Sequence, residues 1–275
     1  MRESLTMRKC ILISQMRSGT HVLRSVLSQT PSIFDVGEVL HQDAANFDSH
    51  LNFYNFQSKL VSIDHKLILP QWRQWLWDEF ISYLEQVYPI DKEKGLESIL
   101  LFDIKYILLN SLDGWATLPA TYPWLLYKAI ECGYSIIHLI RTDIVRQIVS
   151  RLLAEETDQW AMHPGDQPIF KKILVDIDLF RKTFFQYKEE RNFVSSSLSS
   201  YDNKLEVEYE TLFPIERNLK SNYIRKSLER FLGVSINWSD TNFIKQGTYE
   251  LKDIIVNYDE FINCIDSQPP NVLNR

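Results

Sequence analysis

Three short segments of this chain carry residue types suited to gripping and moving an anionic group. The first, "SQMRSGTH", follows an apolar run and offers the hydroxyls of Ser18 and Thr20, the guanidinium of Arg17 and a glycine, Gly19. A glycine lets the backbone approach a ligand closely, and the following helix aims unpaired amides at the same place. Arg17 adds a forked donor for phosphate or sulfate. The segment predicts an anion site; the alternative is a tight turn capped by Thr20.

The second segment, "DVGEVLH", places Glu38 directly after a glycine at the end of a short apolar run. A carboxylate in a partly dry cleft can take a proton from a substrate hydroxyl, an effect of about 10²–10⁴-fold in rate. His41 is a second candidate base. A helix-starting carboxylate that only meets a dipole or an arginine explains Glu38 equally well.

The third segment, "HLIRTDIVRQIVS", puts Arg141 at the end of an apolar run and Ser150 on the helix that follows. A guanidinium and a hydroxyl so placed can hold one phosphate from two sides. The alternative is a pair of Arg141 with Asp143 at the helix start, with Ser150 only packed against the sheet. Together with the first segment, this one predicts a ligand with two separated anionic groups.

Alternating strand and helix patterns predict the scaffold that positions these segments. Apolar runs occur in "KCILIS", "SIFDVGE", "SILLFDIKYILL", "SIIHLI" and "KLEVEYE", and helical patterns lie between them. This order predicts an α/β fold, a single domain over residues 1–275 with a mainly parallel central sheet flanked by helices. Ligands of such sheets bind at the carboxyl ends of the strands, so the three segments should share one crevice. From Tyr249 onward we expect one closing helix.

Composition narrows the class of protein. A chain of 275 residues fits one α/β domain, and a net charge of −6 disfavours broad nucleic-acid binding. No apolar run approaches the roughly 20 residues of a transmembrane helix. The residues before the first apolar run lack a hydrophobic segment, so we expect no secretory signal. The three cysteines are far apart, which favours buried free thiols over a disulfide framework or a metal cluster. We therefore expect a cytoplasmic protein; the sequence leaves a homodimer open.

The combined segments resemble the sulfotransferases that use 3′-phosphoadenosine 5′-phosphosulfate (PAPS). "RSGTHVLRSVLSQTPSIFDVGEVLH" is similar to Nod-factor sulfotransferases and, more loosely, to tyrosylprotein sulfotransferases, and "HLIRTDIVRQIVS" resembles the trehalose-sulfating bacterial group. Weaker similarity in "FDIKY", "LEVEYETLF" and "KQGTYELKDIIVNYDEF" extends over most of the chain. The resemblance implies a P-loop-like sulfotransferase fold, PAPS as donor, adenosine 3′,5′-bisphosphate (PAP) as product, and no metal.

The resemblance also implies roles for individual residues. The loop residues become ligands of the phosphosulfate: Arg17, Ser18, Gly19 and Thr20. Arg141 and Ser150 become ligands of the 3′-phosphate, and Glu38 becomes the general base. His21 occupies a position where related loops carry Thr, Ser or His. Lys105 and Lys245 are weaker candidates for donor contact, and an ordinary surface lysine explains each of them equally well.

The acceptor is less constrained than the donor. The resemblance favours a hydroxyl of a carbohydrate or glycolipid, with a peptide tyrosine or a small secondary metabolite left open. Trp72, Trp75 and Trp77 offer a sugar-stacking surface, but their helical spacing favours an ordinary core or a dimer face. A P-loop kinase or nucleotidase is a rival, although the Gly-Lys-Ser/Thr ending of its loop is missing. A nucleotide-binding protein without catalytic activity is the rival from another class.

Overall fold

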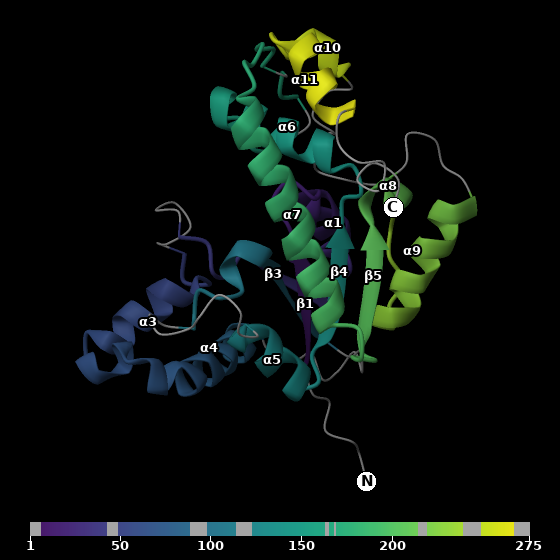
Figure 1. Cartoon of the computed structure of the whole chain (residues 1–275). Coiled ribbons are helices and arrows are strands. Elements are labelled where there is room, and N and C mark those ends of the chain that lie inside the picture. The colour runs from purple at the N-terminus through teal and green to yellow at the C-terminus, as the bar shows by residue number, and fades with distance from the viewer. Residues whose placement is uncertain are drawn as a thin grey trace.

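Five parallel strands form the centre of the protein, in the order β2-β3-β1-β4-β5 (Figure 1). The computed structural model describes residues 7–42, 49–88, 98–113, 123–162, 165–167, 169–213, 219–238 and 249–266. The strands are β1 (Arg8–Ser14), β2 (Ile33–Gly37), β3 (Ile99–Lys105), β4 (Ser135–Ile140) and β5 (Lys204–Glu208). The predicted α/β fold with a parallel sheet is confirmed.

The three central strands are buried on both faces, which explains why they read as continuous apolar runs. Successive side chains of β1 point to opposite faces of the sheet. Ile11 and Ile13 pack into one hydrophobic cluster, and Cys10 and Leu12 pack into a second cluster on the other face. The sheet therefore has a hydrophobic layer on each side.

One layer consists of α3 (Phe53–Val61), α4 (Arg73–Val87) and α5 (Trp124–Glu131), with part of α7 (Ile177–Ser197). Short 3₁₀ turns join or follow these elements: η1 (His65–Ile68), η2 (Pro70–Trp72) and η3 (Tyr106–Leu108). Trp77 is fully buried in this layer, as the core interpretation of the tryptophans predicts. Trp72 and Trp75, in contrast, are 38% and 40% exposed and contact each other edge to face.

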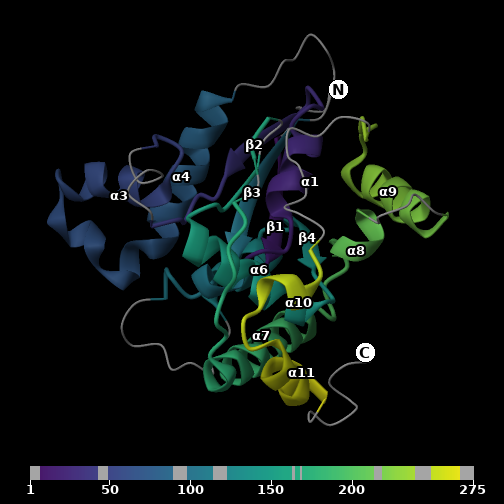
Figure 2. The same cartoon turned by 90° about the horizontal axis from the view of Figure 1, so that it is seen from above.

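The other layer contains α1 (Thr20–Leu27) and α9 (Leu219–Leu232), with the short α8 (Tyr209–Leu212) next to β5. The spacing of Val22, Leu23, Val26 and Leu27 predicts one apolar face on α1; the last three are buried, and Val22 is partly exposed. Figure 2, seen from above, shows α1 and α9 on one side of the strands and α3 and α4 on the other. Because β1 and β4 are parallel neighbours, the loops that leave them open at the same edge of the sheet.

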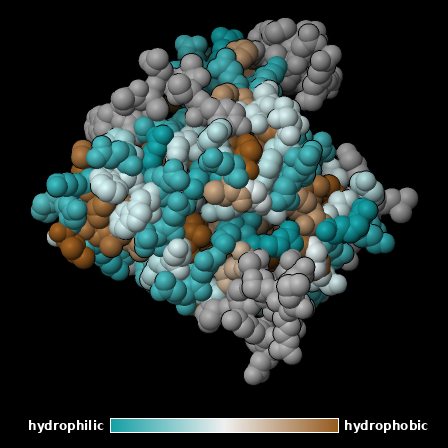
Figure 3. Space-filling view, turned by 90° about the horizontal axis from the view of Figure 1, so that it is seen from below, coloured by the Kyte–Doolittle hydropathy of each residue, from teal (hydrophilic) through white to brown (hydrophobic). Residues whose placement is uncertain are grey.

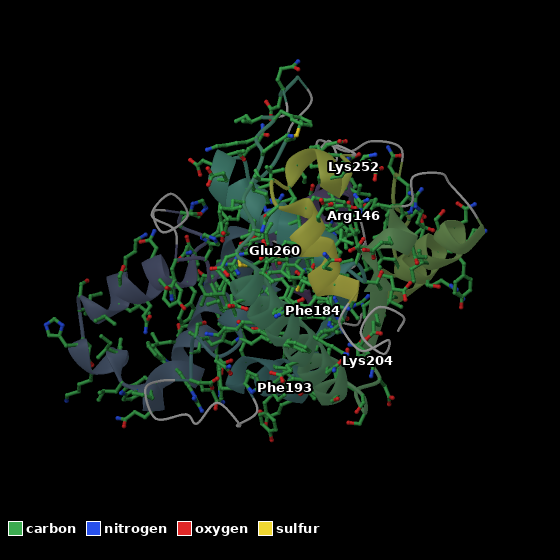
Figure 4. The ribbon with its side chains drawn as sticks, turned by 45° about the horizontal axis from the view of Figure 1, so that its top comes forward. Arg146, Phe184, Phe193, Lys204, Lys252 and Glu260 are labelled. Atoms are coloured by element: carbon green, nitrogen blue, oxygen red, sulfur yellow. The ribbon has the colours of Figure 1, made fainter. Side chains whose placement is uncertain are left out.

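A third hydrophobic cluster joins α6 (Ile144–Thr157) and α7 to α10 (Leu251–Ile254) and α11 (Tyr258–Asp266). The prediction of one closing helix is wrong. The chain leaves helical geometry at Ile255, which pairs as a parallel bridge with Ile173 and so ends α10. In Figure 4, Arg146 of α6 lies close to α10, and it donates to the carbonyl oxygen of Tyr249.

The amino edge of the sheet holds a cavity of about 480 Å³, lined by residues of β1, α4 and the turn after α5. Cys132 lies on this turn and is exposed, so the prediction of three buried thiols holds for Cys10 and Cys264 only. Figure 3, seen from below, shows mixed hydrophilic and hydrophobic side chains on this side. None of the described helices is both long enough and apolar enough to cross a membrane.

Candidate functional site

The loop between β1 and α1 has the backbone geometry of a ligand-binding turn. Arg17 and Gly19 both have positive φ angles, 61° and 82°, and Gly19 is the N-cap of α1. No side chain caps this helix in the described part of the chain. The first amides of α1 therefore face the turn with the partial positive charge of the helix, which favours an anion. We call residues 15–19 the anion loop.

Gly19 is required here by space as well as by conformation. A Cβ atom at this position would lie 2.3 Å from Cε2 of Tyr209, far inside contact distance. Tyr209 follows β5 directly, and its ring also lies 5.4 Å from the guanidinium of Arg141. The residue that follows β5 thus packs against both the anion loop and the loop after β4.

Arg141 and the anion loop are in direct contact. Nη1 of Arg141 donates to the carbonyl oxygen of Arg17 at 2.9 Å, and Nε of Arg141 is buried with no hydrogen-bond partner in the described residues. A buried donor without a partner is costly, and a bound phosphate would satisfy it. Glu210 fixes the same turn by accepting from the backbone amides of Thr142 and Asp143.

The side chain of Arg17 reaches toward α6. Its Nε and Nη2 atoms donate to Oγ of Ser150 at 3.2 and 3.1 Å. Nη1 donates to the carbonyl oxygen of Trp160, whose ring lies 5.9 Å from the guanidinium. Burial, followed by the like charge of Arg141, lowers the pKa of Arg17 to about 10. The sequence assigns Arg17 to the phosphosulfate and Ser150 to the 3′-phosphate. Because Arg17 donates to Ser150, its guanidinium lies next to the residue predicted to bind the 3′-phosphate. We call Arg17, Arg141 and Ser150 the arginine cluster.

A second group of charges lies at the carboxyl ends of β2 and β3. Nζ of Lys105 is 2.6 Å from Oγ1 of Thr20, 2.8 Å from both carboxylate oxygens of Asp103, and 3.3 Å from Oε1 of Glu38. Lys105 is only 7% exposed, so the surface-lysine alternative is wrong. Arg24 of α1 extends the network by pairing with Asp35 and Asp103. We call Glu38, Thr20, Asp103 and Lys105 the carboxylate cluster.

Glu38 lies between two histidines. Nε2 of His21 is 3.4 Å from its Oε1 atom, and Nε2 of His41 is 3.9 Å from its Oε2 atom. Burial alone would raise the pKa of Glu38, but the hydrogen bond from His21 and the charge of Lys105 outweigh it and hold that pKa well below its ordinary value. The carboxylate is therefore ionised, and its 15% exposed side chain is open to a reactant.

The structure brings together most of the residues that the sequence singled out. Glu38, His21 and His41 form one group, and Lys105 links that group to Thr20. Ser18 of the anion loop is buried, and its Oγ atom accepts from Gln147. Lys245 lies outside the described residues. Asp143 caps α6 as expected, accepting from the amide of Arg146. No group of three or more potential metal-ligating side chains occurs among the described residues.

Four contributors to the site were not predicted: Gln147, Trp160, Tyr209 and Glu210. Gln147 carried one usable signal, because it is a polar residue in an otherwise apolar helical stripe three positions before Ser150. Tyr209 and Glu210 directly follow the last strand, which is where ligand-binding turns are expected. Nothing in the sequence pattern points to the carbonyl oxygen of Trp160.

Comparison with known proteins gives a loose structural likeness. No protein-family model matches the chain, and no curated protein matches it significantly. The sulfotransferase domain of the olefin synthase from Synechococcus PCC 7002 superposes with a TM-score of 0.41 and 14% identity, over 99% of this chain and 88% of that one. A sulfotransferase from Alicyclobacillus acidocaldarius gives 0.40 and 12%, over 95% and 94%. Both proteins are named as sulfotransferases, the family that the motifs resemble. Structural similarity at these TM-scores does not indicate the function of this chain.

Proposed function

We propose that this protein is a sulfotransferase that moves the sulfuryl group of PAPS to a hydroxyl of an acceptor. The observation that carries the proposal is the contact of Arg141 with the anion loop, which brings both predicted anion sites to one edge of the sheet. A donor with a phosphate at one end and a phosphosulfate at the other matches two cationic sites at the same edge. The resemblance of the motifs supports the same donor.

In this proposal the arginine cluster holds the 3′-phosphate. The unpartnered Nε atom of Arg141 supplies a donor for it, and Ser150 supplies a hydroxyl. The amides of the anion loop, the side chains of Ser18 and Thr20, and the N-terminus of α1 hold the phosphosulfate. PAPS supplies the sulfuryl group, and PAP leaves. Positioning and preset positive charge lower the barrier, as they do in phosphoryl transfer.

Glu38 is the proposed general base. Its carboxylate accepts the proton of the acceptor hydroxyl, whose oxygen attacks sulfur while the bond to the leaving phosphate oxygen breaks. Lys105 and His21 lower the basicity of this carboxylate in the structure described here. In the proposed complex, the negative charge of the phosphosulfate next to Lys105 would partly offset the positive charge that holds the pKa of Glu38 low. Nε2 of His41 lies 3.9 Å from the other carboxylate oxygen.

A carbohydrate or glycolipid is the proposed acceptor, and a peptide tyrosine or a small secondary metabolite is its alternative. This choice rests on the resemblance to Nod-factor and trehalose-type enzymes. The expected cytoplasmic location is part of the same proposal.

Calorimetric titration tests the donor. PAP should bind at least about 10-fold more tightly than adenosine 5′-monophosphate (AMP), because hydrogen bonds to a charged phosphate contribute about 1.5–3 kcal/mol. Radiolabelled sulfate should then move from PAPS to an acceptor in the presence of a metal chelator, in a screen of glycans, glycolipids and tyrosine peptides. Tighter binding of Mg²⁺-ATP than of PAP would instead support the kinase alternative. PAP binding with no transfer to any acceptor class would support the non-catalytic one.

A further inference from the structure

Gln147 of α6 forms side-chain hydrogen bonds with the anion loop. Its side chain is fully buried. The Nε2 atom donates to the carbonyl oxygen of Met16 at 2.7 Å and to Oγ of Ser18 at 3.0 Å. The two acceptors bracket Arg17 in the chain, so one amide group ties both sides of the residue at the turn of the loop.

The orientation of this amide is fixed by its partners. Rotating the group by half a turn would place Oε1 against the carbonyl oxygen of Met16, and two acceptors would then face each other. With Nε2 in this place, Oε1 is buried and has no hydrogen-bond partner in the described residues. A buried acceptor without a donor destabilises the folded protein. An apolar residue of similar size would avoid that cost, so packing alone does not explain a glutamine here.

The segment from the end of β4 to α6 also contacts the anion loop at Arg17. Arg141, which follows β4, donates to the carbonyl oxygen of Arg17, and Ser150, one helical turn after Gln147, accepts from the side chain of Arg17. Met16, Arg17 and Ser18 are thus each tied to α6 or to the turn that precedes it. These ties hold the loop with Arg17 at φ 61°, a conformation that is unfavourable for a non-glycine residue.

We propose that Gln147 is a positioning residue that fixes the anion loop against α6, so that the two ends of the donor site keep a constant separation. The inference rests on the proposed function. A donor gripped at both ends gains from the second contact only when the two sites are already at the right distance. Gln147 does not need to touch the donor for this role.

The test compares Gln147→Leu with Gln186→Leu, a matched change at an exposed glutamine of α7 that donates to Glu190. Three ligands are titrated: PAP, AMP and adenosine 3′-monophosphate. In Gln147→Leu, PAP affinity should fall about 10-fold or more, because two hydrogen bonds are lost. The two monophosphates, each held at one end, should change less than about 3-fold. Gln186→Leu should leave all three unchanged. Equal losses for all three ligands in Gln147→Leu, or no loss, would overturn the inference.

Gln147→Glu adds a readout that a simple packing role does not move. The carboxylate cannot donate to Met16, but the protonated acid can. Its PAP affinity, relative to wild type at the same pH, should therefore recover as the pH falls. The same ratio for Gln147→Leu should stay flat. A flat ratio for Gln147→Glu would contradict the positioning role.

Hydrogen exchange separates failure of this inference from failure of the proposed function. Amides of residues 16–18 should exchange faster in Gln147→Leu than in Gln186→Leu, while those of β1 stay protected. This measurement needs no ligand. If wild-type protein binds no PAP but the exchange difference is present, the proposed function fails and the tie between Gln147 and the loop stands. Unchanged exchange refutes the tie itself.

Discussion

The two ends of the candidate site balance their charges in different ways. In the carboxylate cluster, Lys105 lies within salt-bridge distance of Asp103 and Glu38. In the arginine cluster, the guanidinium groups donate to neutral oxygens, those of the Ser150 hydroxyl and of backbone carbonyls. Both clusters are positioned by the ends of neighbouring parallel strands, and the anion loop runs between them.

Because their charges are balanced differently, the arginine cluster and the carboxylate cluster should have different roles. A cation already paired with carboxylates adds little net attraction for an anionic ligand, whereas guanidinium groups held by neutral oxygens keep their charge available. The arginine cluster should therefore supply most of the donor affinity. The carboxylate cluster should act mainly on the rate of the chemical step. Four measurements test this division between donor affinity and reaction rate.

The largest expected effect is on turnover in Glu38→Gln. The amide keeps the shape of the carboxylate but cannot accept the proton, so kcat should fall by about 10²–10⁴-fold. PAP affinity should stay within about 3-fold, because the carboxylate cluster contributes little to binding. Steady-state kinetics and calorimetry measure the two quantities. Glu155→Gln, an exposed change on α6, is the control. Unchanged kcat in Glu38→Gln would refute the base assignment.

Gly19→Ala tests whether the anion loop is common to both ends. The new Cβ meets the Tyr209 ring and the backbone has φ 82°, so the free energy of unfolding should fall by about 2–4 kcal/mol. Both kcat and PAP affinity should fall with it. Gly133→Ala has a similar φ of 69° but open space around the Cβ, so only backbone strain of about 1 kcal/mol is expected. Denaturant unfolding measures the difference. Equal losses of unfolding free energy in the two variants would show that the Tyr209 ring moves to accommodate the new Cβ.

Arg141→Ala tests the other end. Loss of a charged donor should weaken PAP binding by about 10–100-fold and raise KM, with much less effect on kcat. Binding of adenosine 5′-phosphosulfate, which has no 3′-phosphate, should change far less. Arg146→Ala, a change at an exposed arginine of α6, the helix that follows Arg141, is the control. If both ligands lose affinity equally, the 3′-phosphate is held elsewhere and the division between the two clusters is wrong.

The smallest expected effect is on stability as a function of pH. The pKa of Glu38 is lower in the folded protein than its ordinary value of 4.5. Ionisation of this carboxyl therefore stabilises the fold above about pH 5, and the stabilisation is lost as the pH falls through the folded pKa. The difference in unfolding free energy between wild type and Glu38→Gln should shrink as the pH is lowered below 4.5. A difference that is constant with pH would mean that the salt bridges around Glu38 do not hold its charge.

The sequence predicted the scaffold well where burial dominates. Strands that are buried on both faces leave long apolar runs, and β1, β3 and β4 were predicted for that reason. The closing helix was predicted as one piece because its helical pattern continues through Ile255. The bridge to Ile173, which is distant in sequence, overrides local helix preference there. Such a contact leaves no local signal.

Within the site, the sequence predicted positions better than side-chain directions. Parallel-strand geometry brought Arg17, Arg141 and Glu38 to one edge, as expected. It gave no reason for Arg17 to extend to Ser150, because a long flexible side chain can reach either end of the crevice. Lys105 was equally ambiguous: its burial depends on Asp103 and Thr20, and only the assembled fold shows how close they are. Whether these residues bind and react as assigned stays a prediction.

The hydrogen bonds of Arg17 bear on the rates at which the proposed donor should bind and dissociate. Its guanidinium already uses the hydroxyl of Ser150 and the carbonyl oxygen of Trp160. If the 3′-phosphate binds at Ser150 as proposed, it should compete with these contacts, and association should then involve an exchange of hydrogen-bond partners. Part of the enthalpy of the new bonds is then offset by the old ones. Wild-type association should be slower than expected from charge alone, and removal of the Arg17 side chain should speed entry while also speeding release.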